Sequence, residues 1–116
     1  MLTTTIDGTE YPLATTLRVA YMVQGENNHK PYSQVFSDLG NMPIESQIGI
    51  LYCAFKVANP NVLMTKQRFL DYYLDNMNIK KIMGQLKVLI QTITGVGDDE
   101  IAATTEAADT QVPEGN

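Results

Sequence analysis

The sequence has few of the residue types from which catalytic and metal sites are built. It contains one cysteine, Cys53, and one histidine, His29. One cysteine excludes an intramolecular disulfide, and one histidine has no second partner for a catalytic triad or a typical zinc site. We expect a solvated imidazole in a polar loop and an inert thiol among apolar neighbours. The chain is therefore predicted not to be an enzyme and to need no metal or cofactor.

The chain also lacks a long apolar run, a basic patch and a glycine-rich phosphate loop. No segment approaches the ~20 apolar residues that a membrane-spanning helix needs, and the N-terminus does not resemble a secretory signal. Of 13 acids, six lie in residues 96–116, where Lys and Arg are absent; residues 1–95 carry the other seven acids and all 8 bases. We expect a cytoplasmic protein that binds no nucleic acid, no membrane and no small-molecule substrate.

What the sequence does contain is a strong helical pattern at its centre. Pro43–Ala58 has apolar residues at helical spacing, and Asn59-Pro60-Asn61 ends the pattern, because the residue before a proline avoids helical geometry. A helix with so broad an apolar face has to be covered by other elements. We expect it at the centre of the fold, packed against the helices that follow. Its predicted buried face consists of Ile44, Ile48, Leu51, Tyr52 and Phe55.

The N-terminal segment predicts a small β-hairpin. Asp7-Gly8 suits the positive φ angles of a tight turn, and it separates Leu2–Ile6 from Glu10–Leu13. Two strands alone are marginal in water, so the hairpin is expected to lean on a helix. An exposed edge of the hairpin could pair with another subunit.

Two helices are predicted between the hairpin and the central helix. Thr15 or Thr16 can cap the first, and Gly25 is expected to end it. Pro31 suits the first turn of the second, and Gly40 is expected to close it. The predicted apolar faces are Leu17, Ala20, Tyr21 and Gln24 in the first helix and Val35, Phe36 and Leu39 in the second.

Two more helices are predicted after the central one. Thr65 can cap a helix over Lys66–Met77, and Asn78 can cap a last helix that Gly95 ends. Their apolar faces are Phe69, Leu70, Tyr73, Leu74 and Met77 in the former and Ile79, Ile82, Met83, Leu86, Leu89, Ile90 and Ile93 in the latter. The fold class is thus mainly α (α+β): an N-terminal hairpin and about five helices in a small orthogonal bundle. The predicted domain covers residues 1–95, and residues 96–116 are predicted to be a flexible, disordered acidic tail.

The last helix carries the predicted partner-binding surface. Its apolar positions approach the 3.5-residue period of a seam between packed helices, which also suggests self-association. Methionines beside the helices are typical of surfaces that adapt to imperfectly matched apolar partners. The alternative is that the same face fills the domain's own core. The candidate partner-binding residues are Met83, Leu86, Leu89, Ile90 and Ile93.

The N-terminal pattern resembles that of the tail assembly chaperones of long-tailed phages and prophages of Gram-positive hosts. The matching stretches are Thr5-Ile6-Asp7-Gly8 through Tyr11 and Leu13, and Thr16-Leu17-Arg18 with Tyr21. The central helix, Phe69–Leu74 and the acidic end fit the same plan, so that the resemblance spans roughly residues 3–94.

The resemblance implies a partner and a role. The partner would be the tape measure protein, a long and largely helical chain that sets tail length. Many copies of the chaperone would line it in the host cytoplasm, keep it soluble until the tail tube polymerises, and be absent from the mature virion. Relatives are often made in two lengths by a translational frameshift, so the tail after Gly95 would be the unshifted ending.

Two other function classes remain open at this point. A structural tail or connector subunit would share the small helical fold, but it would be present in the virion. A small helical regulator would need a basic recognition helix, and only Lys80, Lys81 and Lys87 approach one. Three lysines in a chain of net charge -5 make the regulator the weaker alternative.

Overall fold

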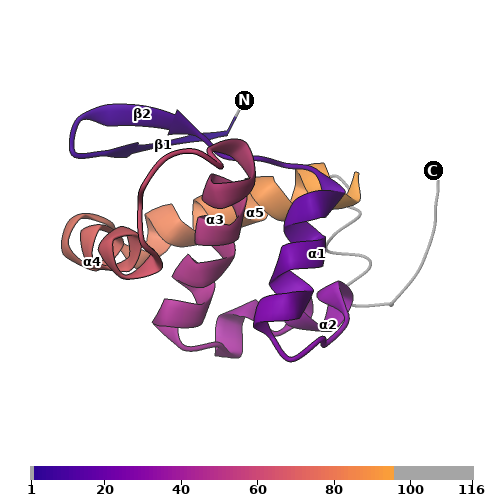
Figure 1. Ribbon diagram of the computed structural model, residues 1–116. Coiled ribbons are helices and arrows are strands. Elements are labelled where there is room, and N and C mark those ends of the chain that lie inside the picture. Colours follow the sequence, from indigo (N-terminus) through magenta and orange to yellow (C-terminus); the bar gives the residue numbers. More distant parts are fainter. Residues whose placement is uncertain (1, 96–116) are drawn as a thin grey trace.

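The computed structural model describes residues 2–95, which form a β-hairpin followed by five α-helices (Figure 1). The predicted mainly α fold is confirmed in this range, whereas the predicted tail, residues 96–116, lies outside the described residues. The elements are β1 (Thr3–Ile6), β2 (Thr9–Pro12), α1 (Leu17–Glu26), α2 (Tyr32–Ser37), the 3-10 turn η1 (Leu39–Asn41), α3 (Ile44–Ala58), α4 (Lys66–Asn76) and α5 (Ile79–Thr94).

The hairpin forms as predicted around Asp7 and Gly8. Both residues have positive φ angles, 53° and 82°, as a two-residue turn between right-twisted strands requires. β1 and β2 pair in antiparallel fashion with Ile6 opposite Thr9. Thr4 and Ile6 are buried under the hairpin, so its inner face packs on the helices. This packing is needed because two strands alone are only marginally stable in water.

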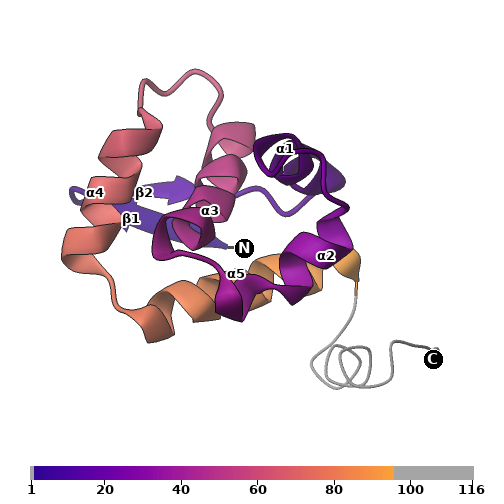
Figure 2. The same ribbon diagram turned by 90° about the horizontal axis from the view of Figure 1, so that it is seen from below.

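Helix α3 occupies the centre of the fold, as predicted. It contacts α1, α4, α5 and β2, and Figures 1 and 2 show these elements around it. Its burial extends beyond one face, because neighbours lie on several sides of it. Ile44, predicted to be buried, is 43% exposed at the N-terminal end. The buried residues of α3 are Gln47, Ile48, Ile50, Leu51, Cys53, Ala54 and Phe55.

Aromatic rings fill the space between the hairpin, α3 and α4. The ring of Phe55 lies 5.1 Å from that of Tyr11 and 5.3 Å from that of Phe69. Phe69 in turn stacks on Tyr73 at 4.6 Å. Edge and offset contacts of this kind add to the free energy gained from burial alone. This cluster joins the hairpin to the helices.

The predicted buried face of α1 is wrong at two positions. Leu17 is 72% exposed and Tyr21 is 68% exposed, while the residues that pack inward are Val19, Ala20 and Val23. The small and β-branched side chains let α1 approach α3 closely, and the larger pair is left in solvent. There the guanidinium of Arg18 lies 6.0 Å from the centre of the Tyr21 ring.

The predicted ends of α1 and α2 also need correction. α1 continues through Gly25 to Glu26, and the chain turns instead at Asn28 and His29, whose φ angles are 60° and 62°. Asn27 supports this ending, since its Nδ2 donates to the Val23 carbonyl at 2.7 Å. α2 begins after Pro31 as predicted but ends at Ser37, before η1. The predicted burial of this segment is confirmed, because Val35 and Leu39 are buried and Phe36 packs against the core.

The caps of the last two helices are confirmed. The Thr65 side chain accepts a hydrogen bond from the Arg68 amide at 3.1 Å, and the Asn78 side chain accepts one from the Lys81 amide at 2.8 Å. Each bond satisfies an amide that the first helical turn leaves unpaired. α5 ends at Gly95, whose φ of 73° is the left-handed conformation that glycine adopts without strain.

Candidate partner-binding surface

The structure places the predicted partner-binding residues of α5 mainly in the domain's own core. Leu86 and Leu89 are completely buried, and Ile93 is 9% exposed. Met83 and Ile90 are half-buried and pack against the same core. Leu86 and Leu89 are therefore corrected to core residues, since a partner could reach them only if α5 left the domain. The seam-like period of α5 reflects its packing on α3 and α1.

A second apolar surface lies at the N-terminal half of α3, where the helix is incompletely covered. Three hollows meet there, and Ser46 lines all of them. Together they run along α3. The end of α1 and the segment after it lie on one side of them, and α4 lies on the other. We call the two larger ones the α4 hollow and the α2 hollow.

The α4 hollow is the more apolar of the two. It has a volume of about 600 Å³, and its floor and walls include Ile44, Leu70 and Leu74. Leu74 is 53% exposed and Ile44 is 43% exposed, so that both side chains are available to a partner. Its polar lining residues are Glu45, Ser46, Lys66 and Gln67. The sequence pattern placed all three apolar residues on inward faces. Their spacing shows that each belongs to an apolar stripe of its helix, but it does not show whether a neighbouring element covers that stripe.

The α2 hollow is more polar, with a volume of about 480 Å³. Carboxylate, ammonium and amide groups lie around it beside a few apolar side chains. The lining residues are Asn27, Lys30, Val35, Asp38, Asn41, Met42, Pro43 and Ser46.

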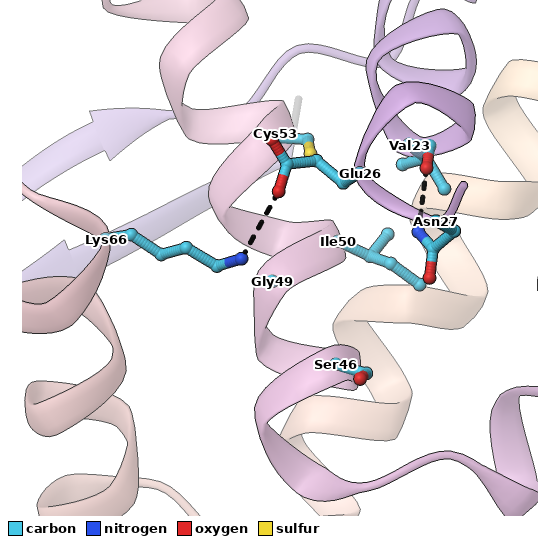
Figure 3. A pocket seen from close by; sticks show the side chains of 8 residues that line it. All are labelled: Val23, Glu26, Asn27, Ser46, Gly49, Ile50, Cys53 and Lys66. Carbon is cyan, nitrogen blue, oxygen red and sulfur yellow. Dashed lines mark hydrogen bonds and ion pairs between the residues drawn. The ribbon is translucent and has the colours of Figure 1, made fainter. Parts of the chain in front are cut away.

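A small pocket of about 50 Å³ lies between the two hollows (Figure 3). The Lys66 side chain crosses it from α4, and its Nζ lies 3.4 Å from Oε1 of Glu26 on α1. Gly49 lies under this ion pair, and a Cβ there would come within 3.5 Å of Lys66 Cε. The ion pair is about half exposed, so it contributes little to stability, but it bridges α1 and α4 across this pocket.

Cys53 lines this pocket but is not chemically activated. Its side chain is 3% exposed, and burial raises the pKa of the thiol to about 11. The Glu26 carboxylate raises this pKa further, and Lys66 lowers it. At neutral pH the group is therefore a protonated thiol, without the thiolate that a nucleophile needs.

The other chemistry-bearing residues are scattered. His29 is exposed in the loop after α1. Within residues 2–95 no three His, Cys, Asp or Glu side chains are grouped so as to hold a metal ion. Nor does this part of the chain contain a helix of the length and apolar character needed to cross a membrane.

A buried polar network lies beneath the hairpin. The Tyr73 hydroxyl lies 2.7 Å from the Thr4 hydroxyl, and it donates to Oε1 of Gln85 at 2.9 Å. Because the single proton of Tyr73 goes to Gln85, Thr4 is the donor in the other bond. The network links β1, α4 and α5, so it fixes the hairpin over the aromatic cluster.

Comparison of the chain with known protein families, with curated proteins and with solved structures gave no match.

Proposed function

We propose that the chain is a tail assembly chaperone that binds the tape measure protein in the host bacterial cytoplasm. It would keep this partner soluble until the tail tube polymerises around it, and it would then leave. The proposal starts from the N-terminal resemblance, and the observation that carries it is the α4 hollow. There Ile44 and Leu74 expose apolar surface beside the half-buried Leu70.

The α4 hollow suits one apolar stripe of a partner helix. An amphipathic helix binds by placing apolar side chains, spaced three or four residues apart, into such a groove. Glu45 and Lys66 beside it carry opposite charges, so the rim offers polar contacts to a partner of mixed charge. A hollow of about 600 Å³ holds only a few side chains, so each contact is expected to be weak.

Weak contacts fit the proposed role. Many copies along one long helical partner would hold it through multivalency, and each copy would still be displaced readily when tube subunits arrive. The net charge of -5 on each copy would oppose aggregation of the loaded complex.

The proposal is tested by co-expression with a tape measure protein, the long helical partner that the proposal names. The soluble fraction of that protein should rise with wild-type chain and fall back with Ile44→Asp or Leu74→Asp. Leu63→Asp is the matched control, because Leu63 is 97% exposed and lies outside the hollow. The function is refuted if the long protein is equally soluble without the chain. The assignment of the surface is refuted if Leu63→Asp acts like the hollow variants.

The structural-subunit alternative predicts a different location. A chaperone should be absent from purified mature particles, whereas a tail or connector subunit should be present in a fixed copy number. Quantitative mass spectrometry of purified particles separates these outcomes, and a fixed copy number would replace our proposal with the structural one.

A further inference from the structure

The two outer edges of the hairpin are not equivalent. The Leu13 amide donates to the Leu2 carbonyl at 2.9 Å, which makes these two residues a hydrogen-bonded pair. Bonded and non-bonded pairs alternate along an antiparallel ladder, and the register pairs Thr3 with Pro12 and Thr5 with Glu10. These two are the non-bonded pairs. Their backbone amides and carbonyls therefore point away from the hairpin, along its outer edges.

The edge formed by β2 is closed to a further strand. Pro12 has no amide to donate, and its carbonyl already accepts a hydrogen bond from Nδ2 of Asn59 at 2.9 Å. Glu10 adds an exposed charge beside it. Proline and charge are the devices by which proteins commonly prevent pairing at a sheet edge.

The edge formed by β1 has none of these devices. The outward amides and carbonyls of Thr3 and Thr5 make no hydrogen bond with any other part of the described chain. β1 reads Thr-Thr-Thr-Ile, without proline or charge, and threonine and isoleucine favour extended structure. Four neighbouring backbone groups are thus presented in strand geometry on one side of the molecule.

We propose that β1 pairs edge to edge with β1 of a second copy of this chain, forming a four-stranded sheet across a twofold axis. With the axis at Thr4, Thr3 of each copy lies opposite Thr5 of the other. This register makes four backbone hydrogen bonds and satisfies all four outward groups on both strands.

Side chains favour the same register and a second copy as occupant. Leu2 then lies opposite Ile6 of the other copy, on the face that also carries Thr4. Leu2 is half-buried in the single chain, so the pairing covers apolar surface that is partly exposed. On the outer face Thr3 and Thr5 form cross-strand threonine pairs, which sheets favour.

Dimerisation through β1 is weak and depends on concentration. Strands of four residues bury much less than the roughly 1,200 Å² typical of stable complexes. Such an interface does not involve the tape measure protein, so its test uses the purified full-length chain alone and is separate from the test of the proposed function.

Two proline variants at opposing positions test the proposal. Thr5→Pro removes an outward amide from the β1 edge. Glu10→Pro removes the corresponding amide from the β2 edge and leaves the backbone bonds of the hairpin intact, although it also removes the carboxylate that accepts from Oγ1 of Thr3 at 3.1 Å. In sedimentation velocity from about 10 µM to about 1 mM, a range that spans weak association, wild type and Glu10→Pro should shift towards dimer. Thr5→Pro should stay a monomer throughout. A monomeric wild type, or equal dimerisation of the two variants, overturns the proposal.

Hydrogen exchange of the wild-type chain provides a measurement that does not depend on any variant's folding. The amides of Thr3 and Thr5 should exchange several-fold more slowly at about 1 mM than at about 10 µM. The Glu10 amide, on the opposite edge, should exchange at the same rate at both concentrations. Exchange of Thr3 and Thr5 that is independent of concentration would overturn the proposal even if the chain dimerises by another surface.

Discussion

Replacing Tyr73 with phenylalanine removes one hydroxyl from the centre of the polar network and leaves the ring in place. Tyr73 is completely buried, and its ring stacks on Phe69 at 4.6 Å. Since phenylalanine keeps this stacking and almost the same volume, the change isolates the hydrogen bonds. Thr4, which is 3% exposed, then has a hydroxyl donor without an acceptor. Gln85 is half-buried, so water can replace its lost donor more easily.

The expected loss of stability follows from these burials. Leaving one buried polar group unsatisfied costs about 1–3 kcal/mol. For a domain of this size, each kcal/mol lowers the melting temperature by about 4–8 °C. A loss near the middle of the range, about 2 kcal/mol, therefore predicts a melting temperature lower by about 8–16 °C.

Urea denaturation followed by circular dichroism measures this loss directly. Tyr72→Phe is the matched control: Tyr72 is the half-buried neighbour on α4, and its hydroxyl makes no hydrogen bond within the described residues. The double variant Thr4→Val with Tyr73→Phe also removes the orphaned donor, so its loss should be smaller than the sum of the two single losses. A Tyr73→Phe variant as stable as wild type, or a loss no larger than that of Tyr72→Phe, would refute the role given to this network.

Three further predictions concern α5 and Cys53. Leu86→Ala should cost about 2–5 kcal/mol of unfolding free energy, whereas Val88→Ala, at a 44% exposed position of the same helix, should stay within about 0.5 kcal/mol in the same urea assay. Asn78→Ala removes the α5 cap and should cost about 1 kcal/mol by the same measurement, and no loss would mean that the cap is dispensable. Folding raises the pKa of Cys53 from 9.0 to about 11, so the fold favours the neutral thiol; this stabilisation is complete below pH 9 and is lost as the pH rises through 11. Between pH 9 and pH 11 the Cys53→Ala variant should therefore lose about 2 kcal/mol less unfolding free energy than wild type. Parallel pH profiles of the two proteins would contradict the burial of the thiol.

Local signals in the sequence were sufficient to predict the order of the elements. A turn dipeptide, two side-chain caps and a terminal glycine act through groups a few residues apart, so their effect is visible without knowledge of the fold. Thr65, Asn78 and Gly95 all have the predicted positions. The end of α1 was missed because Asn28 and His29 adopt left-handed geometry there while Gly25 stays helical.

The orientation of each helix depends on neighbours that periodicity does not identify. On α1, Val19 and Val23 define one stripe and Leu17 and Tyr21 another, and the close approach to α3 selects the smaller side chains. On α3, the buried Gln47 carries no apolar signal at all. Its Nε2 donates to the Leu39 carbonyl in η1 at 2.7 Å, a bond that exists only after the segment before α3 has folded against it.

Because periodicity does not identify the neighbours of a helix, the sequence placed the candidate surface on α5, whereas the structure indicates α3 and α4. The periodicity of α5 predicted a seam, and the seam exists, but α3 and α1 are its partners. On α4 the apolar stripe is wider than the surface that α3 covers: Phe69 packs against Phe55 and Tyr52 of α3, whereas Leu74 is 53% exposed. Leu74 is left at the rim of the hollow as a result. Only the packed structure distinguishes a stripe that is covered from one that is available.

The two proposed contacts involve different ends of α3. The hairpin joins the C-terminal end of α3 through the Ala14 amide, which donates to the Ala54 carbonyl at 3.0 Å, and through Asn59. The α4 hollow includes Ile44, the first residue of α3, and therefore lies at the N-terminal end of this helix. Fifteen residues of helix separate these ends by roughly 20 Å. A dimer joined through β1 would present two such weak sites to one long partner, which is the arrangement that multivalent binding requires.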